Sequence, residues 1–151
     1  MATSRRTEII DLLVTQLKEI DGAQSSFDGS YTYNSNIFTN VFRKIKFIDE
    51  VNDFPALYLS AGTENRDFNT KSLTVATLDV TIRAYVYGED DSQTKADELV
   101  QDIEHVIYNL AGSPEKGILN IQIDNVSTDE GLAEPLGLAE IILTVEYRLE
   151  D

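Results

Sequence analysis

Cysteine is absent from the 151-residue sequence. Its absence excludes disulfide bonds, thiolate zinc sites and cysteine nucleophiles together, and a chain that needs no disulfide bonds fits a reducing compartment. Long apolar runs are missing as well. Glu8 and Asp11 interrupt the apolar stretch near the N-terminus, so no secretory signal is predicted. No uncharged apolar segment approaches the roughly 20 residues that a membrane-spanning helix needs, so we expect a soluble protein without a membrane partner.

Positive charge is scarce, because 12 Lys and Arg stand against 27 Asp and Glu, for a formal net charge of −15. Such a surface repels phosphate backbones, which argues against a protein that binds DNA or RNA. The charge is also unevenly distributed. Residues 1–48 hold six basic and five acidic residues, whereas residues 49–151 hold six basic and 22 acidic ones. The N-terminal third is therefore the one region that is locally basic.

The length and the apolar content predict one domain that spans residues 1–151. Hydrophobic residues make up 42% of the chain and include seven Tyr and six Phe. A chain of this size buries roughly two thirds of its unfolded surface, which is enough for one packed core without metals or disulfide bonds.

Apolar residues at helical spacing predict two helices. The first helix is expected to begin at Ser4, whose side chain is a good N-cap, and to end near Gly22. The second is expected to begin at Asp91 or Ser92 and to end at Gly112. The apolar positions of the two helices are Ile9, Ile10, Leu13, Leu17, Ile20, and Ala96, Leu99, Val100, Ile103, Val106, Ile107, Leu110.

Alternating apolar residues predict five strands, at residues 41–47, 56–61, 73–86, 118–126 and 138–149. The apolar phase of the third strand slips by one residue near Ala76 and Thr77, which indicates a β-bulge there. In the fourth, Leu119, Ile121 and Ile123 are expected to share a face. Residues 23–40 read as a long loop or irregular edge strand, and residues 62–72 as a polar connection.

The order α-β-β-β-α-β-β, with one apolar stripe per helix and one apolar face per strand, predicts an α+β fold. We expect a mixed, mostly antiparallel sheet with both helices packed on one face. The sequence contains no internal repeat.

Residues for catalysis are few. The only histidine, His105, lacks cysteine or a second histidine to complete a zinc site, so we interpret it as a helix-surface residue. Acidic pairs and triplets at residues 89–91, 97–98 and 129–130 could serve a hydrolase as acid and base or bind Mg²⁺ or Ca²⁺. In a chain with 27 acids, however, such neighbours are expected by chance. No Walker A, GxGxxG, GxSxG or EF-hand pattern occurs. We therefore predict no enzyme, no metal and no cofactor.

Two short segments carry a resemblance to a known family. They are residues 52–64 (NDFPALYLSAGTE) and 127–132 (STDEGL), the second leading into 137–141 (GLAEI). Together with the N-terminal helix and residues 85–90 (YVYGED), they are similar in order and spacing to the tail terminator, or tail completion, proteins of long-tailed bacteriophages. The resemblance extends over nearly the whole chain.

The resemblance implies a structural virion protein. Such a protein forms a homohexameric ring at the head-proximal end of the tail, stops polymerisation of the tail tube protein, and provides the docking surface for the head-completion or connector protein. DNA would pass through the ring without specific binding, and assembly would take place in the host cytoplasm. Three alternatives stay open: another small phage neck or tube protein, a carboxylate-based metal-dependent hydrolase, and an acidic adaptor that mimics DNA.

A ring protein of this kind needs contact surfaces. Lys44 and Lys46 form a basic patch that either joins neighbouring subunits or protects a strand edge from aggregation. Arg66, Asp67 and Phe68 lie in the predicted 62–72 connection, which fits a protein contact or a solvated loop equally well. The many acidic residues in the rest of the chain either keep DNA from adhering inside the ring or keep the protein soluble. The complete set of interface candidates is Lys44, Lys46, Asp53, Phe54, Glu64, Arg66, Asp67, Phe68, Asp129 and Glu130.

Overall fold

The computed structural model of the protein describes residues 4–37, 40–44, 50–51, 53–68, 74–112, 117–132 and 134–149. Its elements follow the predicted order α-β-β-β-α-β-β. They are α1 (Arg5–Leu17), β1 (Val41–Phe42), β2 (Ala56–Phe68), β3 (Thr74–Tyr87), α2 (Ser92–Gly112), β4 (Ile118–Thr128) and β5 (Leu136–Leu149).

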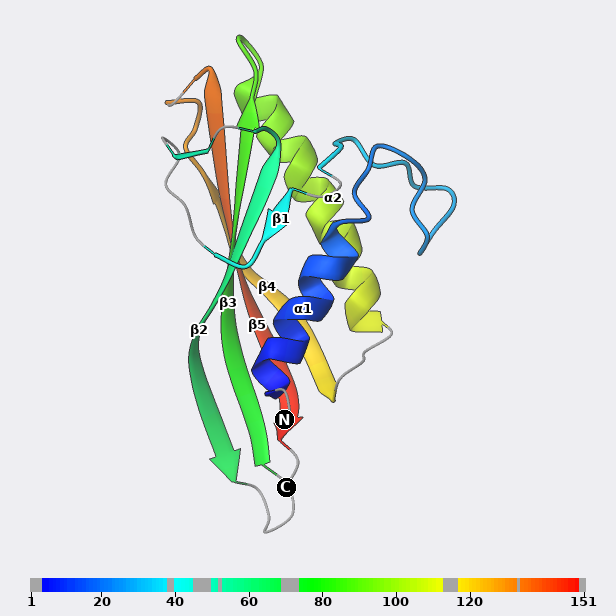
Figure 1. The fold of residues 1–151 in the computed structure, drawn as a ribbon, viewed down its shortest axis with the longest axis vertical. Helices are drawn as coiled ribbons and strands as arrows, with labels where there is room; N and C mark the ends of the chain where they lie inside the picture. Colours follow the sequence, from blue (N-terminus) through cyan, green and yellow to red (C-terminus); the bar gives the residue numbers. More distant parts are fainter. Residues whose placement is uncertain are drawn as a thin grey trace.

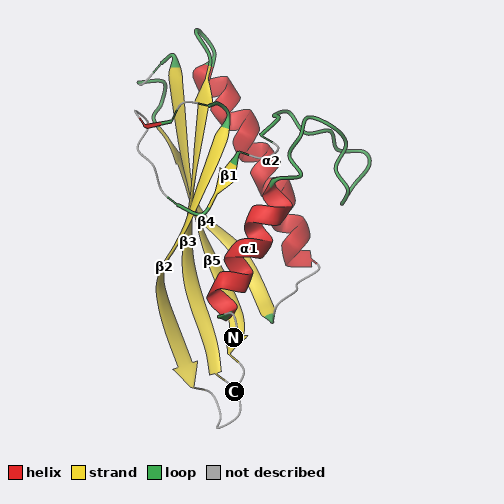
Figure 2. Cartoon of the chain, in the orientation of Figure 1, coloured by secondary structure: helices red, strands yellow, loops and turns green. Residues whose placement is uncertain are grey.

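The strands form one sheet with the order β1-β2-β3-β5-β4. β1 runs parallel to β2, with Val41 opposite Leu57, whereas the other three pairs are antiparallel. Both helices cover the same face of this sheet (Figures 1 and 2). The predicted α+β fold, with its mixed and mostly antiparallel sheet, is confirmed. The order also places β4 and the β1–β2 pair at opposite edges.

α1 begins and ends through local hydrogen bonds. The Ser4 hydroxyl accepts a hydrogen bond from the Thr7 amide at 3.2 Å, as the predicted N-cap. The helix stops at Leu17, five residues before the predicted Gly22. The amide of Ile20 bonds to the Leu17 carbonyl at 3.1 Å in a tighter turn, which carries the Ile20 side chain into the core. The apolar spacing thus predicted correctly that Ile20 is buried, although the α-helix ends before this residue.

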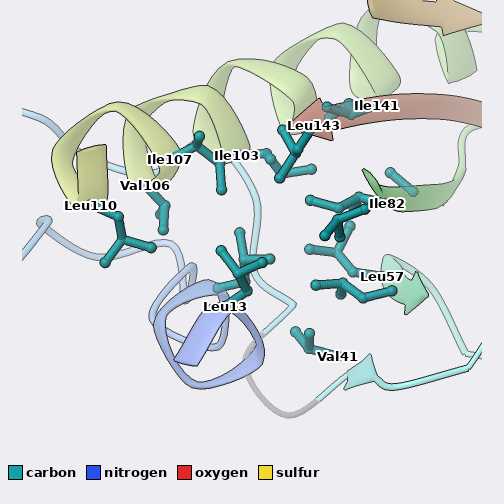
Figure 3. Packing of buried hydrophobic residues seen from close by; sticks show 14 of the residues in the cluster. Leu13, Val41, Leu57, Ile82, Ile103, Val106, Ile107, Leu110, Ile141 and Leu143 are labelled. Atoms are coloured by element: carbon teal, nitrogen blue, oxygen red, sulfur yellow. The ribbon is translucent and has the colours of Figure 1, made fainter. Parts of the chain in front are cut away.

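The core lies between the helices and the sheet. α2 supplies Ile103, Val106, Ile107 and Leu110, and α1 supplies Leu13, all at most 4% exposed. Figure 3 shows these side chains meeting those of the strands, namely Val41, Leu57, Ile82, Ile141 and Leu143. Each fully buried Leu or Ile contributes about 1.5–3 kcal/mol. This shared apolar layer fixes both helices on one face.

Two strands differ in length from the prediction. β1 ends at Phe42 rather than at residue 47, and residues 45–49 lie outside the described part. β2 continues to Phe68, so residues 62–68 belong to a strand and not to the predicted polar connection. They pair with β3, where Glu64 lies opposite Leu78. Their polar side chains suit this position because β2 is an outer strand over much of its length.

The β-bulge was predicted in β3, and this prediction was wrong. β3 keeps one phase from Ala76 to Val86, with every second residue buried, and Val75 lies on the opposite face. The irregularity is in β2, between Ala61 and Glu64. The apparent slip in the sequence arose because Val75 was assigned to the buried face.

β4 also carries its apolar residues in a different phase. Ile118 and Ile121 are buried, whereas Leu119 is 47% exposed, so the prediction that Leu119 shares a face with Ile121 and Ile123 was wrong. Register shifts between Ile118 and Asn120 and between Ile123 and Asn125 account for the difference. Irregularities of this kind are common in edge strands.

Candidate interaction surfaces

Most of the interface candidates lie at the two ends of the sheet, and Figure 1 shows that α2 begins at one end and α1 at the other. Asp53 and Phe54 precede β2, and Asp129 and Glu130 follow β4, so all four lie at the end where α2 begins. We call this the α2 end. The other end, where α1 begins, holds residues 64–68, and we call it the α1 end.

At the α2 end, aromatic side chains border a cleft of about 420 Å³. The ring centroids of Phe54 and Tyr87 are 6.3 Å apart, and Tyr87 is 47% exposed. The Phe54–Pro55 peptide is cis. Lys95, from the first turn of α2, also lines the cleft and donates a hydrogen bond to the Tyr87 carbonyl at 3.2 Å. A half-exposed aromatic wall beside charged groups is chemically suited to a contact with another protein.

The turn between β4 and β5 completes this end. An Asp129 carboxylate oxygen accepts hydrogen bonds from the amides of Gly131 and Leu138, each at 3.4 Å. Glu130 adopts a φ of 57° and is exposed, and Leu132 is 88% exposed. Asp129 therefore shapes the turn, while Glu130 and Leu132 are among the side chains that it presents to solvent.

At the α1 end, Glu64 is held in place by its neighbours. Its side chain is only 5% exposed and accepts hydrogen bonds from the Tyr147 hydroxyl and from Arg66 Nε, the latter at 2.7 Å. Burial by itself would raise the pKa of Glu64, but these hydrogen bonds and the charges of Arg66 and Arg6 leave that pKa below its ordinary value. Glu64 is thus a structural anchor, and the Arg66 side chain, 53% exposed, is the part open to a partner.

Asp67 and Phe68 lie in the last part of β2, and their side chains are outside the described part of the structure. The prediction that Arg66, Asp67 and Phe68 sit in a loop was wrong, because all three belong to the strand. Their role as contacts stays a prediction.

Lys44 lies in a bend after β1, where the prediction had a half-exposed strand. It is exposed, and its Nζ lies 6.0 Å from the ring centroid of Phe42. Phe42 in turn stacks on Tyr58 with centroids 5.3 Å apart, and neighbouring Arg43 pairs with Asp11 at 3.2 Å. Lys46, the other half of the predicted patch, is outside the described residues.

The residues that attach the 23–37 loop to α2 were missed in the sequence. Asp102 is fully buried, and its carboxylate accepts hydrogen bonds from the Tyr31 hydroxyl (2.8 Å) and from the amides of Asn34 (3.0 Å) and Ser35 (2.8 Å). Burial and this carboxylate raise the pKa of Tyr31 well above its ordinary value. A signal was available, because Asp102 occupies the apolar stripe of α2 between Leu99 and Val106.

His105 belongs to the same attachment. Its ring stacks on Tyr31 with centroids 4.0 Å apart and an angle of 6°, and its Nε2 lies 2.7 Å from the Ser25 hydroxyl oxygen. Phe27 and Tyr33 approach the same ring edge-on. The interpretation of His105 as an ordinary surface residue was therefore wrong, since the aromatic side chains of the 23–37 loop cover it.

Comparison with known proteins identifies the family. A family model described as Bacteriophage Tail Tube Terminator Protein matches residues 3–151. The chain belongs to this family. It is 31% identical over 156 residues to the tail tube terminator protein p142 of Escherichia phage T5, an alignment that covers 95% of this chain and 93% of the relative.

The fold occurs in a solved phage-like particle as well. A chain of the virion of a native gene transfer agent particle aligns with a TM-score of 0.51, over 75% of this chain and 81% of that one. At 12% identity this likeness shows the fold alone. The family match confirms the resemblance deduced from the sequence, and this tail terminator is a structural protein of the phage tail.

Within the described ranges, no three His, Asp or Glu side chains lie close enough together to hold a metal ion. No helix among the described residues is long and apolar enough to span a membrane.

Proposed function

We propose that this tail terminator caps the tail tube as a homohexameric ring, stops tube polymerisation, and presents the docking surface for the head connector. One observation carries the proposal. The match to tail tube terminators runs through residues 3–151, and the T5 relative aligns over 93% of its own length. The alignment therefore covers nearly all of both chains. The proposed role is structural and involves no catalysis.

The two ends of the sheet support this role. A cap between tube and head needs two different surfaces on opposite sides, and a ring needs a further pair between subunits. The α2 end offers aromatic rings beside carboxylates, and the α1 end offers the exposed Arg66 guanidinium. The net charge of −15 would repel DNA from the inside of the ring, so that DNA passes without specific binding.

Location on the tube tests the proposal. The protein, labelled with gold, is incubated with tubes of its own tail tube protein and viewed by electron microscopy. We expect the label at one end of each tube, with six copies per labelled end by mass photometry of the released rings. Label along the tube wall would make the protein a tube component, and unlabelled tubes would refute the proposed role.

A further inference from the structure

The two edges of the sheet differ in their protection. β4 forms one edge along its full length, and no described strand pairs with its outer side. Edge strands are usually protected from association by charged residues, especially Lys, by Pro, by β-bulges or by short length. The 11 residues of β4 contain neither Lys nor Pro. Two large apolar side chains are exposed on it, Leu119 at 47% and Val126 at 37%. Two register shifts and Asp124 interrupt this edge, but a long edge strand with exposed apolar groups is still the kind that another chain covers.

β4 carries one charged side chain, Asp124, and the turn that follows it carries three further acidic residues. Residues 117–136 contain no Lys or Arg. Their acidic residues are Asp124, Asp129, Glu130 and Glu134. A partner for the β4 edge therefore has to present positive charge together with some apolar surface.

The opposite edge of the same chain meets this requirement. There α1 lies over β2, and a groove of about 330 Å³ between them is lined by Arg6 and Arg43. Arg6 donates a hydrogen bond to the Gly62 carbonyl at 2.8 Å, and Arg43 remains 46% exposed although it pairs with Asp11. Exposed Lys44 follows, and the Phe42 ring is 38% exposed.

We infer that the β4 edge of one copy docks against the basic β1–β2 edge, residues 40–44 and the adjoining first turns of α1, of the next copy. The inference rests on the proposed ring and assigns its subunit interface. Contact between two different edges of identical chains is head-to-tail, and it forms a closed ring when the rotation between copies allows. At physiological salt, repulsion between the −15 subunits is screened beyond about 8 Å, so the local charges at the contact decide the pairing.

Reversing the charge of either edge tests this assignment. The basic-edge variant carries Arg43→Glu and Lys44→Glu, and the acidic-edge variant carries Asp124→Lys and Glu130→Lys. Each variant alone places like charges at every junction, so we expect a single subunit of 16.9 kDa by mass photometry where the parent forms rings. An equimolar mixture should recover the ring, because alternation of the two variants restores an acidic edge against a basic one at all six junctions.

A matched control carries Lys18→Glu and Arg148→Glu, which produce the same change in net charge as the basic-edge variant but are exposed positions just after α1 and on the inner strand β5, outside both edges and the α2-end cleft. It should form rings like the parent, and circular dichroism checks that every variant is folded. Where rings form only on tubes, the same comparison is made by counting capped tube ends. Assembly of either edge variant alone, or failure of the folded mixture to assemble, would overturn the docking. A parent protein that neither forms rings nor caps tubes would instead refute the proposed function.

Discussion

Replacing Asp102 with alanine should detach the 23–37 loop and destabilise the protein. The buried carboxylate accepts three hydrogen bonds, at 2.8, 3.0 and 2.8 Å, from the Tyr31 hydroxyl and the amides of Asn34 and Ser35. A hydrogen bond to a charged group contributes about 1.5–3 kcal/mol. The loss is smaller than the sum of three such bonds, because a carboxylate is costly to bury and the released loop regains water. We expect a loss of about 3 kcal/mol.

That loss corresponds to a fall in Tm of about 6–12 °C for a domain of this size. Chymotrypsin provides a local measurement, since the loop carries Phe27, Tyr31 and Tyr33 but no other large apolar residue before Ile37. Asp102→Ala should be cut faster within the loop at temperatures where the rest is folded. Asp97→Ala, an exposed change on the same helix, is the control. Equal Tm and equal cleavage rates for the two variants would refute the assignment of Asp102 as the loop's anchor.

Three further predictions concern stability. Glu64→Gln should destabilise the protein by about 1–2 kcal/mol at pH 7. Because folding lowers the pKa of Glu64, the difference in unfolding free energy between parent and variant should be complete above the pKa of the unfolded state and should vanish as the pH falls through the pKa of the folded state. Urea titrations from pH 7 to 3 measure this difference. Gly137→Ala should cost about 1–3 kcal/mol, because the added Cβ would lie 2.6 Å from Val86 Cγ2, whereas Gly29→Ala, with open space around it, should be close to neutral by thermal melts. Leu143→Ala should cost about 2–5 kcal/mol through the cavity left in the core, measured by urea denaturation, and a loss below 1 kcal/mol would contradict that packing.

Regular spacing of apolar residues predicted the helices and strands that bury one continuous row of apolar side chains. α2 and β5 carry their apolar residues at fixed spacing, and both elements were predicted, together with the buried residues of α2 such as Ile103, Val106 and Ile107. The order of elements then limited the fold to one sheet with helices on one face. The sequence motifs at residues 52–64 and 127–132 predicted the family, which the comparisons confirm.

Features that depend on partners distant in sequence were missed. The second half of β2 reads as polar, and only pairing with β3 makes it a strand. The phase of β4 depends on two register shifts against β5, which local spacing does not reveal. Asp102 and His105 acquire their roles from a loop about 70 residues earlier in the chain, through the Tyr31 side chain. Tertiary contacts, rather than local propensity, decide such residues.

Tube elongation tests the central claim most directly. Tubes of the cognate tail tube protein are grown in the presence of rising amounts of this protein, and their lengths are measured by electron microscopy. If the protein caps the growing end, mean length should fall as its ratio to tube protein rises, and tubes capped beforehand should not elongate when fresh tube protein is added. Length distributions that are identical at every ratio, with continued growth of treated tubes, would contradict termination by this protein.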